Sequence, residues 1–76
     1  MDNKEILNKK HIHFIGICGI SMSSLALLLV NNNIKITGSD IQYNQIVKDL
    51  RTKKIKVTIG HCENNIEKDC DLVVYT

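Results

Sequence analysis

The chain has 76 residues, 43% of them hydrophobic and 24% charged, and carries a formal net charge of +2 at pH 7. A chain of this length buries only about 60% of the surface that its unfolded form exposes, so the sequence allows one small core and one domain at most. Aromatic residues make up 4% and Trp is absent. With so few side chains for base stacking and no strongly basic surface, a nucleic-acid partner is not expected.

Membranes and disulfides are not indicated either. The first ten residues carry charges of both signs and lack the apolar stretch of a secretory signal. The most apolar run, Leu25 to Val30, is much shorter than the roughly 20 residues that a membrane span needs. The three cysteines, Cys18, Cys62 and Cys70, are odd in number and show no CxxC spacing, so we expect reduced thiols. These features predict a cytoplasmic protein with no membrane partner.

Short β-branched runs alternate along the chain with longer amphipathic runs. Residues 1–10 are interpreted as an N-terminal extension, and one α/β domain is predicted over residues 11–76. The Leu-rich second half of its first helix is expected to pack against a sheet, and Asn31 to Asn33 can end this helix because Asn tolerates the left-handed conformation. The expected elements are a strand at His11 to Ile17, a helix at Ile20 to Asn32, a strand at Ile34 to Gly38, a helix at Gln45 to Lys54, a strand at Ile55 to Ile59, a short turn or helix at Glu63 to Lys68, and a strand at Asp71 to Tyr75.

This order of elements is typical of a Rossmann-like, three-layer α/β fold with a parallel sheet and right-handed crossovers. The expected strand order is 3-2-1-4, with the switch point between the first and fourth strands. In such sheets ligands bind beyond the carboxyl ends of the strands at that point. Because the predicted fourth strand reaches the last residues of the chain, we expect the domain to be incomplete at its C-terminus and the chain to be a fragment of a larger multidomain protein.

The segment from Gly16 to Ser21 carries the strongest chemical signal, because it lies where a strand is predicted to become a helix. Glycine allows a tight turn there, and amides at the helix N-terminus can face a phosphate group, with the hydroxyls of Ser21 and Ser23 as further donors. Asp40, at the end of the second predicted strand, has about the spacing from Gly16 of a carboxylate that binds a ribose. The alternative is a plain turn and helix cap, with Asp40 as a turn residue.

The loop departs from the dinucleotide-binding pattern GxGxxG. Gly16 is retained, but Cys18 stands at the second glycine position and Ser21 at the third. A side chain at the second position obstructs the close approach of a pyrophosphate to the backbone. Tight binding of NAD is therefore not expected.

Several other residues admit a functional reading beside a plainer one. His11 and His13 share one face of a strand and could form half of a metal site, but no third ligand is evident, so no metal is predicted. His61 and Cys62 are adjacent and point apart, which disfavours a pairing of base and nucleophile. Cys18, if exposed beside a helix N-terminus, would have a favoured thiolate. The basic residues are interpreted as the solvated face of the second helix: Lys48, Arg51, Lys53, Lys54 and Lys56.

The stretch from His13 to Ala26, HFIGICGISMSSLA, resembles the opening motif of the Mur ligases, in particular of the branch that joins L-alanine to UDP-N-acetylmuramate. The usual form in that family is HFIGIGGxGMSG, so Cys18, Ser21 and Ser24 stand here in place of glycines. Four separated motifs make the resemblance more specific than the glycine loop alone. In chain order it continues through Thr37 to Asp40, Ile59 to His61, Asn65 and Ile66, and Asp71 to Thr76.

The resemblance implies the N-terminal UDP-N-acetylmuramate-binding domain of an ATP-dependent ligase of peptidoglycan precursor synthesis. By this likeness Ser39 and Asp40 would lie at the uridine, and His61 would face the nucleotide from the end of the third strand. In the full enzyme ATP converts the muramoyl carboxylate to an acyl phosphate, which the amine of L-alanine attacks, and magnesium and a P-loop domain do this work. The segment that would cradle the diphosphate consists of Gly16, Ile17, Cys18, Gly19, Ile20, Ser21, Met22 and Ser23.

No GxxxxGK[ST] motif and no cluster of magnesium-binding carboxylates occurs in the sequence. We therefore expect the chain alone to hold no cofactor and no catalytic residue, and ATP, magnesium and L-alanine to bind in domains outside it. Three alternatives stay open: the related ligase that recycles muramoyl tripeptide, which is similar at Gly16 to Gly19; a stand-alone Rossmann module that senses NAD or ADP; and half of a dehydrogenase domain. Gly60, His61 and the Val-Val-Tyr-Thr ending favour the alanine-adding branch.

Overall fold

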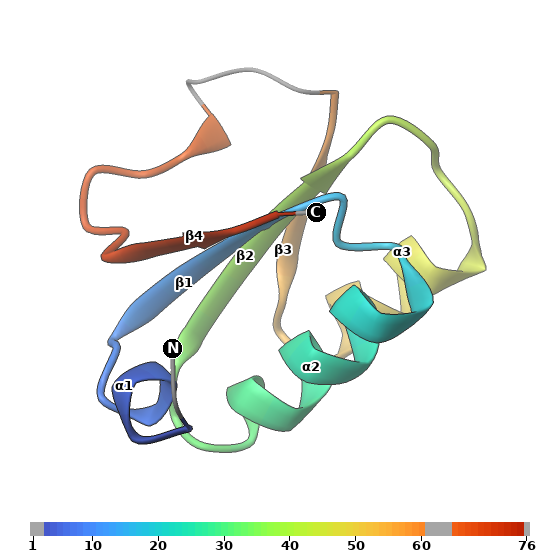
Figure 1. The fold of residues 1–76 in the computed structure, drawn as a ribbon. Helices are drawn as coiled ribbons and strands as arrows, with labels where there is room; N and C mark the ends of the chain where they lie inside the picture. Colours follow the sequence, from blue (N-terminus) through green and yellow to red (C-terminus); the bar gives the residue numbers. More distant parts are fainter. Residues whose placement is uncertain (1–2, 61–64, 76) are drawn as a thin grey trace.

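The computed structural model describes residues 3–60 and 65–75 of the chain. Within these residues four parallel strands form one sheet in the order β3-β2-β1-β4 (Figure 1). The predicted α/β class and strand order 3-2-1-4 are confirmed. The strands are β1 (His11–Ile15), β2 (Lys35–Asp40), β3 (Lys56–Ile59) and β4 (Leu72–Val74), and the helices are α1 (Asn3–Leu7), α2 (Ile20–Val30) and α3 (Gln45–Thr52).

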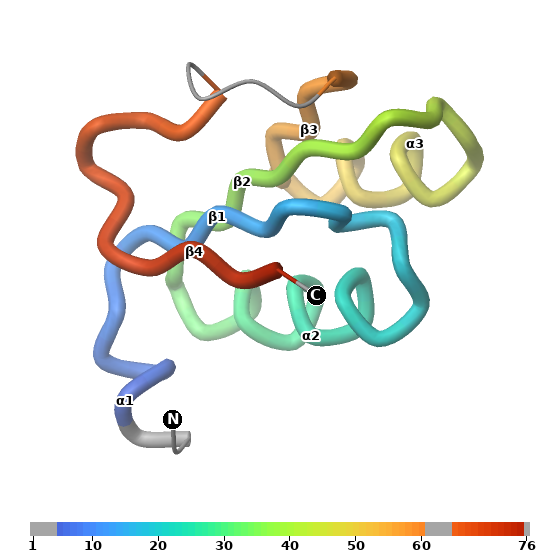
Figure 2. The backbone as a smooth tube through the Cα atoms, turned by 45° about the horizontal axis from the view of Figure 1, so that its top comes forward, coloured from blue at the N-terminus to red at the C-terminus, as the bar shows by residue number. Residues whose placement is uncertain are grey.

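The two longer helices, α2 and α3, pack on the same face of the sheet (Figure 2). Alternate residues of β1, Ile12 and Phe14, project toward this face and are fully buried. Full burial of such a side chain contributes about 1.5–3 kcal/mol, so the apolar side chains on this face stabilise the fold substantially. The other buried apolar side chains of the core are Ile17, Met22, Ala26, Leu29, Ile34, Ile36, Val47, Leu50, Ile55 and Val57.

Several elements end at residues other than those predicted. β1 stops at Ile15 because Gly16 takes a φ of 79° and turns the chain out of the sheet. β2 runs on through Ser39 and Asp40, which pair with Thr58 and Ile59 of β3. α2 ends at Val30, and the left-handed residue expected after it is Asn33, with a φ of 63°. The predicted turn or helix at Glu63 to Lys68 falls partly outside the described residues.

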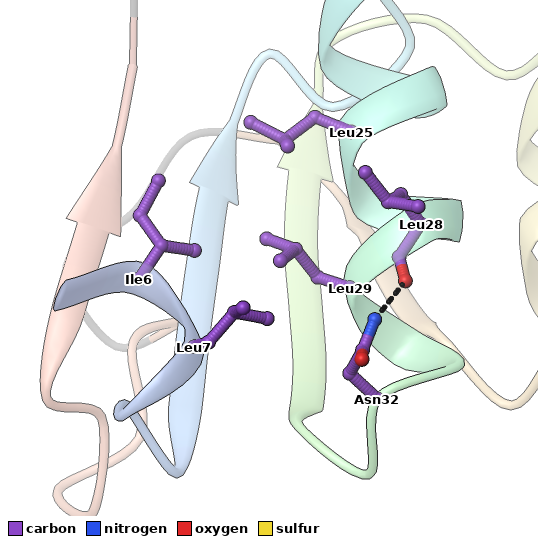
Figure 3. A pocket seen from close by; sticks show the side chains of 6 residues that line it. All are labelled: Ile6, Leu7, Leu25, Leu28, Leu29 and Asn32. Carbon is purple, nitrogen blue, oxygen red and sulfur yellow. Dashed lines mark hydrogen bonds between the residues drawn. The ribbon is translucent and has the colours of Figure 1, made fainter. Parts of the chain in front are cut away.

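The N-terminal extension contains α1, a short helix that the sequence did not predict. Figure 3 shows Ile6 and Leu7 of α1 facing the second half of α2. Together they border a cavity of about 250 Å³, which is lined by Ile6, Leu7, Leu25, Leu28, Leu29 and Asn32. Leu28 remains 62% exposed and Ile20, at the other end of α2, 83%, so the sheet covers less of α2 than its apolar composition suggested. None of the helices in the described part of the chain has the length and apolar character needed to cross a membrane.

Candidate functional site

The loop between β1 and α2 forms the tight turn that the sequence predicted at Gly16. Gly16 adopts a left-handed φ of 79°, which glycine takes at little cost, and its carbonyl oxygen accepts a hydrogen bond from the Gly19 amide at 3.2 Å. Gly19 then occupies the N-cap position of α2 with extended backbone. Because β1 lies between β2 and β4, this turn is at the switch point of the sheet, where ligands bind in folds of this kind.

The loop is fastened to the neighbouring strand β2. The amides of Gly16 and Ile17 both donate to the carbonyl oxygen of Ser39, at 2.9 and 3.1 Å. The Ile17 side chain is fully buried and lies over Gly38, where an added Cβ atom would come within 2.8 Å of Ile17 Cβ. Gly38 is therefore needed for the position of the loop. Sequence reasoning included it only as part of a motif, because no local pattern reveals contact between residues so far apart in the chain.

Asp40, the last residue of β2, holds the same loop through its side chain. Its Oδ2 accepts a hydrogen bond from the Cys18 amide at 3.0 Å, and its Oδ1 accepts one from the Ile41 amide at 2.8 Å. Burial raises the pKa of the Asp40 carboxyl group, but the amides of Cys18, Ile41 and Gln42 together outweigh burial and hold this pKa below its ordinary value. The carboxylate is therefore ionised at neutral pH.

A second set of hydrogen bonds joins the end of β3 to the end of β2 at Asp40. The Gly60 amide donates to the Asp40 carbonyl oxygen at 2.7 Å, and the side-chain amide of Asn65 donates to the Gly60 carbonyl oxygen at 2.8 Å. Three motifs that the sequence showed separately, at Gly16, Asp40 and Gly60, therefore meet at one end of the sheet. His61, predicted to face the nucleotide, lies outside the described residues.

The first turn of α2 has backbone donors without an acceptor in the helix. The amides of Gly16 to Gly19 each donate within the protein, and the helical ladder starts with the Ser23 amide, which donates to Gly19 at 2.8 Å. The amides of Ile20, Ser21 and Met22 precede that ladder and have no acceptor within the helix. Gly19 supplies no side-chain cap, and the first turn has no acidic residue. With the positive end of the helix dipole, these three donors suit an anion such as a phosphate group.

The side chains predicted to bind the substrate differ in exposure. Ile20 and Ser21 are exposed at the start of α2, whereas Met22, Ser23 and Ser39 are buried. The Ser23 hydroxyl donates to the Ile20 carbonyl oxygen at 3.2 Å. Of the two hydroxyls predicted to bind an anion, that of Ser21 is therefore the accessible one.

Cys18 does not have the reactive thiolate that exposure beside a helix N-terminus would give. Its side chain is half-buried, and burial raises the pKa of the thiol, as does the negative charge of neighbouring Asp40. The hypothesis of a favoured thiolate required an exposed sulfur, and burial, followed by the charge of Asp40, instead raises the pKa of this thiol. Cys18 and Cys70 are free thiols in the described part of the chain, and Cys62 lies outside it.

His11 and His13 are both buried and are occupied by a hydrogen-bond network rather than by a metal site. His11 Nδ1 is 2.9 Å from Asp69 Oδ1, and His11 Nε2 is 2.8 Å from Thr37 Oγ1. His13 Nδ1 is also 2.8 Å from Thr37 Oγ1. Over residues 3–60 and 65–75, no group of three or more His, Cys, Asp or Glu side chains is arranged to hold a metal ion.

Comparison with known proteins identifies the family of this chain. The profile of the Mur ligase family, catalytic domain, matches residues 11–76. Over 67 residues, 88% of this chain, the sequence is 57% identical to UDP-N-acetylmuramate–L-alanine ligases of Clostridium botulinum and of Acetivibrio thermocellus. A crystal structure of a murein peptide ligase from Psychrobacter arcticus matches 87% of the chain with a TM-score of 0.80 and 36% identity. The chain spans about 14% of the length of each of these relatives. It belongs to the Mur ligase family, as its motifs predicted.

Proposed function

We propose that this chain is the UDP-N-acetylmuramate-binding domain of an ATP-dependent ligase that joins L-alanine to this nucleotide sugar in peptidoglycan precursor synthesis. The observation that carries the proposal is the uncapped first turn of α2 at the switch point of the sheet. Such a turn offers backbone donors to a diphosphate. The substrate class comes from the names of relatives that are 57% identical to this chain.

The proposal divides the work among the residues of the loop. The amides of Ile20, Ser21 and Met22 donate to the diphosphate, and the Ser21 hydroxyl is a further donor. Gly16 to Gly19 shape the turn that presents these groups. The end of β2, which carries Ser39 and Asp40, lies on the uridine side of the loop in this proposal, and His61 keeps the role at the nucleotide that the family resemblance implies.

We propose that ATP and magnesium bind outside this chain. The sequence has no P-loop motif, and the described residues offer no cluster for a metal ion. We therefore assign ATP, magnesium and L-alanine to parts of the ligase that this chain does not contain, and no chemical step falls to its residues. Because ATP and nucleotide-activated sugars are intracellular, the proposal places the protein in the cytoplasm.

An amide NMR titration of the chain with UDP-N-acetylmuramate, UDP and NAD tests the proposal. Both uridine ligands are expected to shift the amide resonances of Ile20, Ser21 and Met22, and NAD is expected to leave them unchanged. Shifts with NAD alone would indicate a dinucleotide-sensing module instead. Absence of shifts with all three ligands would contradict a diphosphate site in this chain.

A charge added to the first turn of α2 gives a sharper test. Ser21→Glu places a carboxylate at the exposed, positive end of the helix, where it is tolerated by the fold but repels a diphosphate, so UDP is expected to bind about tenfold more weakly. Asn31→Glu adds the same charge at the other end of α2 and should leave UDP affinity unchanged. An equal loss in both variants would mean that net charge, rather than the position of the site, governs binding.

A further inference from the structure

Both carboxylate oxygens of Asp40 accept hydrogen bonds from backbone amides, Oδ2 from Cys18 and Oδ1 from Ile41. Two consecutive residues of β2 accept hydrogen bonds from three consecutive amides of the loop. Ser39 accepts from Gly16 and Ile17, and Asp40 accepts from Cys18. The first two amides bond to a backbone carbonyl, whereas the Cys18 amide bonds to the Asp40 carboxylate. The position of the loop at Cys18 therefore depends on a side chain and can be changed by substitution.

The bond from Cys18 lies directly before the candidate diphosphate site. Cys18 precedes Gly19, the N-cap residue of α2, so the bond fixes the backbone that leads into the first turn. A hydrogen bond from an amide to an ionised carboxylate is roughly twice as strong as one between neutral groups. The same carboxylate brings a negative charge close to the place where a diphosphate would lie, and Coulomb repulsion from it disfavours that ligand. Asp40 therefore favours binding of the diphosphate only if it acts on the shape of the loop.

We propose that Asp40 is a positioning residue: it holds the Cys18 amide, and through it the first turn of α2, in the conformation that receives the diphosphate, and it does not itself bind the ribose or the base. This inference rests on the proposed function above. It gives Asp40 a different task from the place at the uridine that the family resemblance implied. The ionised state of the carboxylate at neutral pH, maintained by its amide donors against the effect of burial, supports it.

The variant Asp40→Asn distinguishes a role in holding the Cys18 amide from a role in binding the ribose. Asparagine has the same shape but only one acceptor oxygen, and because Cys18 and Ile41 bond to different oxygens of Asp40, the NH₂ group of asparagine must face one of these two donors. A ribose hydroxyl, by contrast, can still bond to either end of an asparagine side chain. Asp49→Asn is the matched control, because Asp49 lies on the exposed face of α3 and its replacement removes the same charge away from the loop.

Separate titrations with pyrophosphate and with uridine, which correspond to the two halves of UDP, distinguish the positioning role from direct binding of the ribose. Inorganic pyrophosphate, uridine and UDP are each titrated into the unaltered chain and the two variants, with amide NMR shifts reporting affinity and confirming that each variant is folded. Asp40→Asn is expected to bind pyrophosphate and UDP about tenfold more weakly and uridine equally well, and Asp49→Asn to match the unaltered chain. This loss has the opposite sign to the gain that removal of a negative charge would give by electrostatics alone.

Equal or tighter pyrophosphate binding by Asp40→Asn would overturn the positioning role, as would a loss of uridine binding as large as the loss of UDP binding. A second measurement needs no variant. On acidification of the unaltered chain, the Cys18 amide proton should shift with the same midpoint as the Asp40 carboxyl carbon, and an independent midpoint would also overturn the role. If the unaltered chain binds none of the three ligands, the proposed function fails, whereas this pH titration still shows whether Asp40 holds the loop.

Discussion

The lack of a side chain at Gly38 determines where the β1–α2 loop lies. A Cβ atom there would come within 2.8 Å of Ile17 Cβ and 3.0 Å of the Phe14 carbonyl oxygen, and neither neighbour is the free end of a flexible side chain. Gly16 has the opposite constraint, because the space around it is open but its φ is 79°. Two glycines of one site are therefore required for different physical reasons, one for space and one for conformation.

This difference predicts distinct substitution patterns. Gly38→Ala is expected to lower the free energy of unfolding by about 1–3 kcal/mol through overpacking, and Gly16→Ala by about 1–2 kcal/mol through backbone strain. Because asparagine tolerates the left-handed region, Gly16→Asn should recover part of the loss, whereas Gly38→Asn should be worse than Gly38→Ala. Urea denaturation of the four variants measures this, and recovery by asparagine at Gly38 would contradict the steric argument.

The buried histidine network has a definite direction when His11 is neutral. The Asp69 carboxylate only accepts hydrogen bonds, so His11 carries its proton on Nδ1 and its Nε2 accepts from the Thr37 hydroxyl. Thr37 Oγ1 then accepts from the Nδ1 proton of His13. His13 Nε2 is left as a buried acceptor with no partner among the described residues. The network therefore favours neutral His13, in agreement with its pKa, which burial lowers and which a proton on His11 would lower further.

At the scale of the element, α3 begins where Asn44 provides a cap. The Asn44 side-chain oxygen accepts hydrogen bonds from the amides of Ile46 at 3.0 Å and Val47 at 3.3 Å. Asn44→Ala is expected to lower the free energy of unfolding by about 1 kcal/mol, and Asn44→Asp, which keeps the acceptor, to leave it nearly unchanged. Urea denaturation compares the two, and an equal loss in both would show that the cap contributes little to α3.

The identity and order of the elements could be predicted because periodicity and turn residues are local properties. The ends of the elements could not. β1 stops at Ile15 because Ile17 leaves the strand to pack over Gly38, a contact with β2. β2 gains Ser39 and Asp40 because β3 pairs with them. α1 was missed because a helix of five residues depends on packing, here of Ile6 against the core, rather than on its own short, mixed sequence.

In the candidate site, too, the local features could be predicted and the contacts between distant residues could not. The turn at Gly16 and the helix start after Gly19 follow from glycine placement, and the structure has both. What the pattern could not show is which amides remain for a ligand, because Ser39 and Asp40 take those of Gly16, Ile17 and Cys18 through contacts between distant parts of the chain. The contribution of His61 is a prediction that the described residues leave untested.

At the scale of the whole molecule, the titrating groups with lowered pKa values predict a loss of stability in acid. For His13 the folded-state pKa lies below the ordinary value of 6.5, so the unfolded chain binds the proton more readily. Its contribution to stability is present above about pH 6.5 and is lost as the pH falls below it. Asp69, hydrogen-bonded by His11, and Asp71, by the amides of Lys10 and His11, have pKa values lowered from 3.8. Their contributions are lost only at lower pH, so two stages are expected.

His13→Asn separates the first stage from the second. The asparagine amide lies where the imidazole has Nδ1 and can keep the bond to Thr37 Oγ1, but it does not titrate. Between about pH 8 and about pH 5, the free energy of unfolding of the unaltered chain should fall with a slope of at most about 1.4 kcal/mol per pH unit, the limit for uptake of one proton. The variant should show a flatter dependence over this range and the same loss in stronger acid, where the carboxylates titrate. Urea denaturation across the range measures both curves, and an unchanged slope in His13→Asn would assign the first stage to another group.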